Sequence, residues 1–381
     1  MKTQNKKLVL LMLTFCLIIM LVFSSFVPPK SANADINCSA KSMVVMETLG
    51  GKILYSKNEN EKLPMASTTK IVTAITVIEH CDDLDTLVSV PKSATLVEGS
   101  SIYLRAGERL SIRDLLYGLM LQSGNDAAET LALSIAGSKE AFAILMNQTA
   151  QKAGALNSNF VTPHGLDKSD HYTTALDLAK ITAYALKNED FKQIVSTKSH
   201  QIKATEHNTA RTLINKNKLL SSLEGCIGVK TGYTKKSGRC LVSACERDGM
   251  QVVCVVLNCA PMFEESFDLI QQAYKEYKRF DIMPSYKFVT DIMVEGGKSK
   301  SVRVFSKEGF STIDIIENAD RYRVEYEYES NLTAPVDKGQ VVGRAKVFCD
   351  NNLIFTENLC TIEPVEKEVP TNELQNILEN W

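Results

Sequence analysis

The chain has 381 residues, of which 44% are hydrophobic and 23% are charged. This length predicts two domains rather than one, and the apolar content is sufficient for packed cores. The 43 basic and 45 acidic residues include no Lys/Arg-rich block. The composition therefore argues against a nucleic-acid partner.

The first 34 residues are organised as an export signal. Three lysines precede an apolar run over 8–26, and Ala32-Asn33-Ala34 offers a cleavage site of small residues. We predict a signal peptide over 1–34 and an exported protein, located at the outer face of the cytoplasmic membrane or secreted. An uncleaved N-terminal anchor is the alternative, because the apolar run is long for a signal peptide.

A predicted hairpin, with strands over 42–47 and 52–57, precedes a predicted helix that carries a reactive pair. Ser67 and Lys70 are three residues apart and therefore share one helix face. A lysine with a depressed pKa can take the proton of a serine hydroxyl and make it a nucleophile. The alternative is a helix-capping serine followed by an ordinary lysine. Apolar residues recur behind the pair at helical spacing: Ile71, Ala74, Ile75 and Ile78.

Helical patterns continue to residue 188 and contain a second candidate motif. Ser123-Gly124-Asn125 follows an apolar run over 115–121, which belongs to a helix predicted over 111–121. Further helices are predicted over 126–136, 139–153 and 174–188.

The pattern changes to strands after Gly225. Apolar runs over 226–230, 239–247 and 251–257 predict three strands, and Asp248-Gly249 is a strong hairpin turn signal. A third candidate motif, Lys230-Thr231-Gly232, ends the first of these strands. Taken alone, it would be interpreted as an exposed strand end followed by a turn. A long amphipathic helix is predicted over 263–280.

A domain boundary is predicted near Met283-Pro284, because helical patterns then vanish until the tail. Alternating tyrosines over 321–329 indicate a half-buried strand, and the region 283–365 is predicted to be a small all-β domain without a catalytic constellation. The tail, 366–381, ends in a short amphipathic stripe without Lys or Arg. It predicts at most weak contact with a membrane surface.

The cysteines indicate neither a disulfide framework nor a metal site. Ten are present, and nine remain once Cys16 leaves with the predicted signal. An odd number in a chain of this size does not predict a disulfide framework. The sequence contains no C-x-x-C and no Cys/His cluster, so we expect no metal and no cofactor.

The three motifs S-x-x-K, S-x-N and K-T-G, in this order, are the signature of penicillin-interacting serine enzymes. The sequence resembles the low-molecular-mass penicillin-binding proteins, the serine-type D-Ala-D-Ala carboxypeptidases, over roughly residues 36 to 365. The sequences of four segments at or near the motifs also resemble the family: residues 98–101, 121–128, 163–167 and 230–234. The resemblance implies an α+β fold with a β-lactamase/transpeptidase-like catalytic domain over 35–282. In that domain an antiparallel sheet is flanked by helices, beside a helical lobe, and the small all-β domain follows it.

The same resemblance implies the chemistry. Ser67 would form an acyl-enzyme with a peptidoglycan stem peptide, Lys70 would take its proton, and Ser123 would relay a proton to the leaving amine. The remaining roles concern substrate binding. The implied substrate-binding residues are Asn125 for an amide, Lys230 and Thr231 for the terminal carboxylate, Gly232 for close approach, and the backbone N–H groups of Ser67 and Tyr233 for the oxyanion. β-Lactams would act as covalent inhibitors of the same serine.

Two positions bear on the residue roles that the resemblance implies. His164 has a counterpart in the family and lies in a loop beside the site, but a lone loop histidine is more often structural. Relatives carry an arginine that binds the terminal carboxylate near the start of the long helix, where this chain has Met262 and no arginine over 257–267. Methionine cannot replace a bidentate arginine–carboxylate contact. This departure puts efficient carboxypeptidase activity in question.

Three other functions stay open from sequence alone. A DD-endopeptidase that cuts peptidoglycan cross-links would use the same residues. A β-lactamase would need a glutamate-bearing loop, and the corresponding segment 160–167 has no glutamate. A non-catalytic wall-binding protein could retain the fold, although every motif residue is present.

Overall fold

The structure is a computed structural model that describes residues 38–368. The predicted signal peptide over 1–34 and the amphipathic stripe of the tail lie outside the described residues. Within 38–368, no helix is both long and apolar enough to cross a membrane.

The segment that carries the three motifs is built on a five-stranded antiparallel sheet in the order β2-β1-β9-β8-β7. Both ends of this segment contribute strands, as predicted, because β1 pairs with β9 along its whole length. β7, which carries Lys230-Thr231-Gly232, lies at the edge of the sheet. The strand bounds are β1 Ser42–Glu47, β2 Ile53–Lys57, β7 Cys226–Thr234, β8 Gly238–Arg247 and β9 Met250–Leu257.

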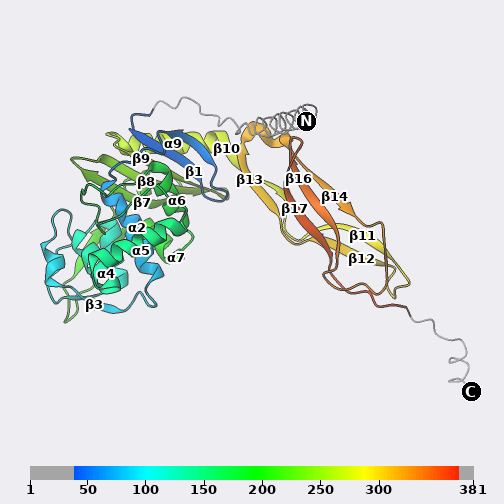
Figure 1. Ribbon diagram of the computed structural model, residues 1–381, viewed down its shortest axis with the longest axis horizontal. Helices are drawn as coiled ribbons and strands as arrows, with labels where there is room; N and C mark the ends of the chain where they lie inside the picture. The colour runs from blue at the N-terminus through cyan, green and yellow to red at the C-terminus, as the bar shows by residue number, and fades with distance from the viewer. Residues whose placement is uncertain (1–37, 369–381) are drawn as a thin grey trace, which may run out of the picture. The chain divides into compact units, whose positions relative to one another are not determined.

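Helices cover both faces of this sheet (Figure 1). α9 packs on β8 and β9 from one side, and the helices that lie between β2 and β7 in the sequence pack from the other. Side-chain caps fix several helix starts: Ser111 accepts the N–H of Asp114 at 3.1 Å, and Thr174 accepts that of Asp177 at 3.0 Å. The helices are α2 Lys70–Glu79, α3 Ile112–Leu121, α4 Asn125–Ala136, α5 Lys139–Lys152, α6 Ala175–Ala185, α7 Glu189–Ser196, α8 Leu219–Ser222 and α9 Met262–Glu276.

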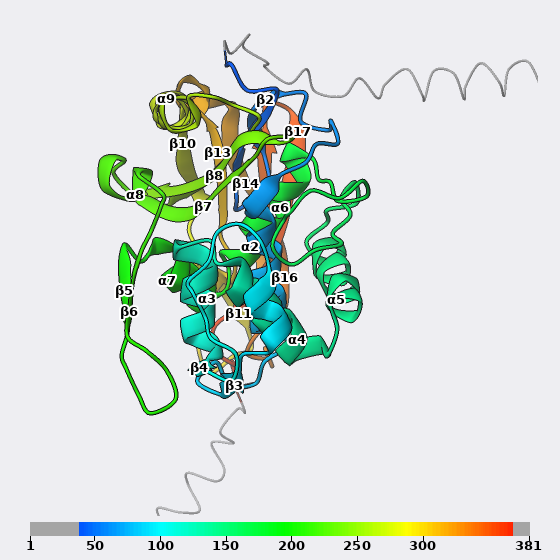
Figure 2. The same ribbon diagram turned by 90° about the vertical axis from the view of Figure 1, so that its left-hand side faces the viewer.

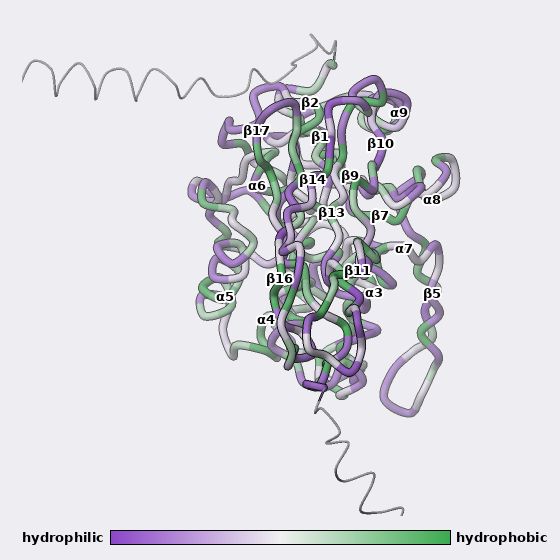
Figure 3. The backbone as a smooth tube through the Cα atoms, turned by 90° about the vertical axis from the view of Figure 1, so that its right-hand side faces the viewer, coloured by the Kyte–Doolittle hydropathy of each residue, from purple (hydrophilic) through white to green (hydrophobic). Residues whose placement is uncertain are grey.

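A two-stranded ribbon of β5 (Ser199–Ile202) and β6 (Arg211–Ile214) extends beside α3, and its loop is mostly hydrophilic (Figures 2 and 3). Its loop end is held by an ion pair, because the guanidinium of Arg211 donates to both carboxylate oxygens of Glu108 at 2.6 and 2.7 Å. The ribbon leads directly into residues 215–218, which reach the motif residues. The shorter elements of the same region are η1 Ala66–Thr69, β3 Leu87–Ser89, η2 Lys92–Leu96 and β4 Arg109–Ser111.

The predicted helix over 263–280 is wrong at its C-terminal end. α9 stops at Glu276, and residues Tyr277–Met283 form β10, which pairs antiparallel with β13. The amphipathic helix pattern continues past this point, but the backbone of β13 supplies cross-strand partners that a sequence window cannot show. Tertiary pairing therefore overrides the local helical preference.

The C-terminal part is all β, as predicted. Its main sheet has six strands in the order β14-β16-β17-β12-β11-β15. Apolar residues that include Val304, Ala345 and Leu359 fill its core. The elements are β11 Lys287–Glu295, β12 Ser301–Ser306, β13 Phe310–Ile315, η3 Ile316–Arg321, β14 Tyr322–Tyr328, β15 Asn331–Thr333, β16 Val341–Cys349 and β17 Asn352–Thr361.

Candidate active site

Ser67 sits in the short turn η1 that leads into α2. Two threonines lock this turn, since the hydroxyl of Thr68 donates to the carbonyl of Met65 at 2.7 Å and that of Thr69 to the carbonyl of Ala66 at 2.8 Å. Ala66 adopts a φ of 49°, a left-handed conformation that non-glycine residues rarely take. Such strain is often found at functional sites, where the surroundings hold it in place.

Two glycines let neighbouring backbones approach this turn. A Cβ on Gly165 would lie 2.0 Å from the carbonyl oxygen of Ala66, and one on Gly232 would lie 3.1 Å from the nitrogen of Ser67. Gly232 was expected to give room to the substrate. In the structure, the space beside its Cα is occupied by the turn that carries Ser67, so this glycine brings β7 against the serine.

Lys70 is buried in the first turn of α2 and is joined directly to Ser67. Its Nζ lies 3.0 Å from Oγ of Ser67, 2.7 Å from Oδ1 of Asn125 and 2.7 Å from the carbonyl oxygen of His164. Burial lowers the pKa of Lys70 well below its ordinary value, and the nearby cations Lys230 and Lys216 lower it further.

These three contacts fix the orientation of a neutral Lys70 amine. Asn125 Oδ1 and the His164 carbonyl can only accept, so they take its two N–H groups. The remaining lone pair then faces the hydroxyl of Ser67, which can donate to it. The arrangement suits proton transfer from Ser67 to Lys70.

Asn125 and Ser123 come from the junction between α3 and α4. The Asn125 side-chain N–H donates to the carbonyl of Glu98, so the amide orientation is determined by its partners on both sides. Ser123 has a φ of 64°, and its buried hydroxyl has no hydrogen-bond partner among the described residues. The structure thus joins Asn125 to Lys70 but leaves the Ser123 hydroxyl free for another group.

Lys230 is buried on β7, and its Nζ donates to the carbonyl of Thr231 at 3.0 Å. Burial, with a contribution from Lys216, lowers the pKa of Lys230 to about 7. Thr231 is half-buried, and the side chain of Tyr233 is 62% exposed at the sheet edge.

Lys216 is a member of the site that sequence reasoning missed. Its ammonium donates to the carbonyl of Gln122 at 2.8 Å, directly before Ser123, and its charge lowers the pKa of both Lys70 and Lys230. It lies in no motif, and only the contacts made after the β5–β6 ribbon bring it here. Nothing in the segment between the helix predicted over 174–188 and the strand predicted over 226–230 singled this lysine out.

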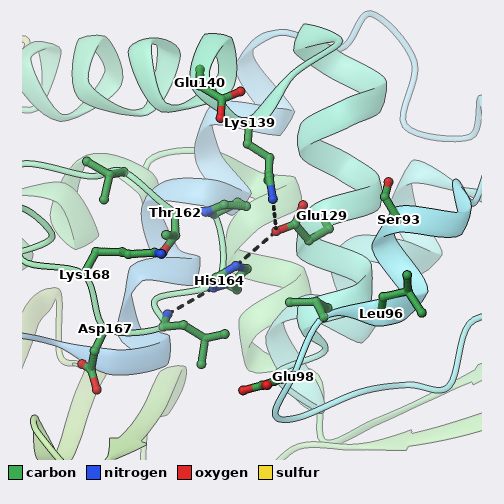
Figure 4. Close-up of a pocket in the computed structure, with 14 residues that line it drawn as sticks. Ser93, Leu96, Glu98, Glu129, Lys139, Glu140, Thr162, His164, Asp167 and Lys168 are labelled. Atoms are coloured by element: carbon green, nitrogen blue, oxygen red, sulfur yellow. Dashed lines mark hydrogen bonds and ion pairs between the residues drawn. The ribbon is translucent and has the colours of Figure 1, made fainter.

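His164 contacts Lys70 through its carbonyl, whereas its ring points into a neighbouring cleft (Figure 4). The N–H of Leu166 donates to Nδ1 of His164, so Nε2 carries the ring proton and donates to Glu129 at 3.1 Å. Burial lowers the pKa of this imidazole. The cleft has a volume of about 670 Å³ and is also lined by Lys139, 3.7 Å from Glu129. His164 therefore positions the lysine through its backbone.

Met262, at the position where an arginine was expected, is the first residue of α9 and is only 6% exposed. It contributes no charge to the site. Within residues 38–368, no group of three or more His, Cys, Asp or Glu residues is placed to hold a metal ion.

Comparison with known proteins identifies the family of this chain. The D-alanyl-D-alanine carboxypeptidase family profile matches residues 29–260, and the profile of the penicillin-binding protein 5 C-terminal domain matches 277–367. The chain belongs to the D-alanyl-D-alanine carboxypeptidase family. It is a serine peptidase of this class, and the predicted family and fold are confirmed.

Individual relatives span nearly the whole chain. D-alanyl-D-alanine carboxypeptidase DacF of Bacillus subtilis is 29% identical over 96% of this chain and 97% of its own length. DacC of Escherichia coli is 33% identical over 86% of this chain and 84% of its own. The crystal structure of penicillin-binding protein 5 from Haemophilus influenzae matches 87% of this chain and 99% of its own, with 28% identity and a TM-score of 0.67.

Gly165→Ala tests the contact that holds the serine turn. The new Cβ would meet the Ala66 carbonyl at a φ of +85°, so we expect the free energy of unfolding to fall by at least about 1–3 kcal/mol and the acylation of Ser67 to slow. Gly137→Ala is the matched control, because φ is +75° there but nothing lies within 4 Å. Equal losses of stability and activity in the two variants, measured by urea unfolding and penicillin labelling, would contradict a specific role for the Gly165 contact.

His171 predicts an acid-sensitive fold around the same turn. Its Nε2 lies 2.8 Å from the Thr69 hydroxyl, and burial lowers the pKa of this imidazole to about 4 from the ordinary 6.5. Between pH 6.5 and 4, His171 binds a proton in the unfolded chain but stays neutral in the folded chain. The free energy of unfolding should therefore fall by up to about 3 kcal/mol over this range.

Urea unfolding at pH 7 and pH 4.5 measures this loss. His171→Gln should reduce the pH dependence, whereas the exposed His207→Gln should not. The same pH dependence in wild type and His171→Gln would refute the assignment.

Proposed function

We propose that this chain removes the terminal D-alanine from peptidoglycan stem pentapeptides through an acyl-enzyme on Ser67. The observation that carries the proposal is the contact of the Lys70 amine with the Ser67 hydroxyl at 3.0 Å, with its two N–H groups held by Asn125 and His164. The lowered pKa of Lys70 favours the neutral form of this base, and the contacts orient it before substrate arrives.

The reaction has two stages. Ser67 Oγ attacks the carbonyl carbon of the last peptide bond while its proton passes to Lys70. The C–N bond then breaks, and the leaving D-alanine amine receives a proton through the unpartnered hydroxyl of Ser123. In the second stage water attacks the ester, releases the shortened peptide and restores the Ser67 hydroxyl.

Backbone donors would stabilise the oxyanion formed in each stage. Ser67 N–H lies against β7 at Gly232, and the next residue along this edge strand, Tyr233, supplies the second N–H. Asn125 would hold a substrate amide, and Lys230 with Thr231 would bind the terminal carboxylate. The unpaired edge of β7 can accept the extended peptide as an additional strand.

The cellular setting is part of the proposal. Stem peptides lie outside the cytoplasm, which fits export by residues 1–34, a catalytic domain over 35–282 and a β domain over 283–365. β-Lactams would acylate Ser67 in the same pocket, and the tail 366–381 would make at most weak contact with a membrane surface. The relatives' names favour the carboxypeptidase over the endopeptidase, β-lactamase and non-catalytic alternatives.

Release of free D-alanine from a D-Ala-D-Ala-terminated pentapeptide by purified 35–381 tests the proposal. We expect release by the wild type and a loss of more than about 10³-fold in Ser67→Ala, because the covalent route is removed. Ser222→Ala, which changes a serine in α8, is the control and should keep full activity. Penicillin labelling without D-alanine release would favour an endopeptidase, and absence of both would favour a non-catalytic protein.

Lys216→Gln tests how the site keeps Lys70 neutral. Removing this cation raises the pKa of Lys70, so a larger fraction of Lys70 is protonated at neutral pH. We expect the acidic limb of the pH profile for Ser67 acylation to move to higher pH, with little change at alkaline pH. The exposed Lys235→Gln should leave the profile unchanged, and an unshifted profile in Lys216→Gln would rule out this electrostatic role.

A further inference from the structure

The residues assigned so far to the substrate carboxylate, Lys230 and Thr231, include no guanidinium. Lys230 is buried, donates to the carbonyl of Thr231, and has a pKa lowered to about 7. The start of α9 offers the thioether of Met262 and no arginine. A carboxylate that must be recognised across the physiological pH range calls for a group that stays ionised, and a guanidinium does so.

The register of the sheet places an arginine beside the substrate edge. In the β7–β8 pair, Tyr233 lies opposite Arg239 and Thr231 opposite Leu241. Side chains directly opposite one another share a face, so Arg239, Tyr233 and Thr231 project from the same side of the sheet. Arg239 is the diagonal neighbour of Thr231, a separation of roughly 7–8 Å between backbones that a long side chain can span.

Arg239 also lies beside the start of α9. The N–H of Cys259 donates to the carbonyl of Arg239 at 2.8 Å, and α9 begins three residues later at Met262. The connection from β9 to α9 therefore runs directly past Arg239. A guanidinium from β8 can serve the region that an arginine on α9 would otherwise serve.

The guanidinium of Arg239 is held in place but not neutralised. Its Cζ lies 5.5 Å from the centroid of the Tyr233 ring, a distance that allows a cation–π contact. The residue is exposed, and the ion pairs formed within 38–368, such as Lys192–Glu246 and Arg279–Asp281, do not include it. Its donors are thus available to a ligand at the end of β7.

We propose that Arg239 is a substrate-specificity residue that binds the terminal carboxylate together with Thr231. This inference rests on the proposed carboxypeptidase function and explains how the chain can function with Met262. The face of the Tyr233 ring keeps the guanidinium beside the edge strand. The carboxylate then pairs with a fixed fork of donors rather than with a point charge.

The test compares ligands with and without the carboxylate. Second-order rates of Ser67 acylation are measured with benzylpenicillin and with its methyl ester, in wild type, Arg239→Gln and Arg239→Lys. We expect Arg239→Gln to slow acylation by the free acid by about 10- to 100-fold, with the ester nearly unaffected. Arg239→Lys should recover only part of the loss. Lys235→Gln, which removes an exposed cation from the β7–β8 turn, should change neither rate.

A rescue variant separates ligand binding from structural damage. Met262→Arg placed in the Arg239→Gln background supplies a guanidinium from α9, and it should restore much of the preference for the free acid. Equal slowing with acid and ester, or no slowing with either, would overturn the assignment of Arg239.

D-Alanine release by the same variants keeps the two proposals distinguishable. If the wild type releases D-alanine but Arg239→Gln keeps its KM and its acid preference, only the inference about Arg239 fails. If the wild type is acylated but releases no D-alanine, the proposed function fails, and the penicillin rates still decide the role of Arg239. A wild type that does neither overturns both.

Discussion

The site depends on one buried amine held at three points. Lys70 is taken out of water, and its partners are Ser67, Asn125 and the carbonyl of His164. Burial makes the charged form of an amine costly, and two neighbouring cations increase this cost. The surrounding structure can be understood as the support for this contact: Asn125 is fixed by the Glu98 carbonyl, and His164 is fixed through Glu129 and Leu166.

The need to hold Ser67 beside Lys70 also explains why two segments distant in sequence have glycine where they contact the turn of Ser67. The loop at Gly165 and the strand at Gly232 both lie against the turn of Ser67: a Cβ on Gly165 would collide with it, and one on Gly232 would make an unusually tight contact. Thr69 and His171 support the turn from behind. The serine is therefore positioned by backbone contacts on several sides, which limits its movement when substrate binds.

Much of this arrangement was predictable because it follows from short-range spacing and strand order. The i, i+3 relation of Ser67 and Lys70, the motif order and the Asp248-Gly249 hairpin led to the fold class and the candidate residues. Lys216 and the ring direction of His164 were not predictable, since they depend on contacts between segments far apart in the chain. The end of α9 was misjudged because β10 gains its partner from β13, more than thirty residues later.

The place of β7 at the sheet edge has a consequence for the protein in concentrated solution. An open edge with free N–H and C=O groups binds an extended peptide, but it equally offers a template to the edge strand of another copy. Lys235, Lys236 and Arg239 are exposed at the end of this edge. If two copies paired here, their positive charges would repel each other. The cations near the substrate edge thus also oppose self-association, and a ligand that occupies β7 closes the edge altogether.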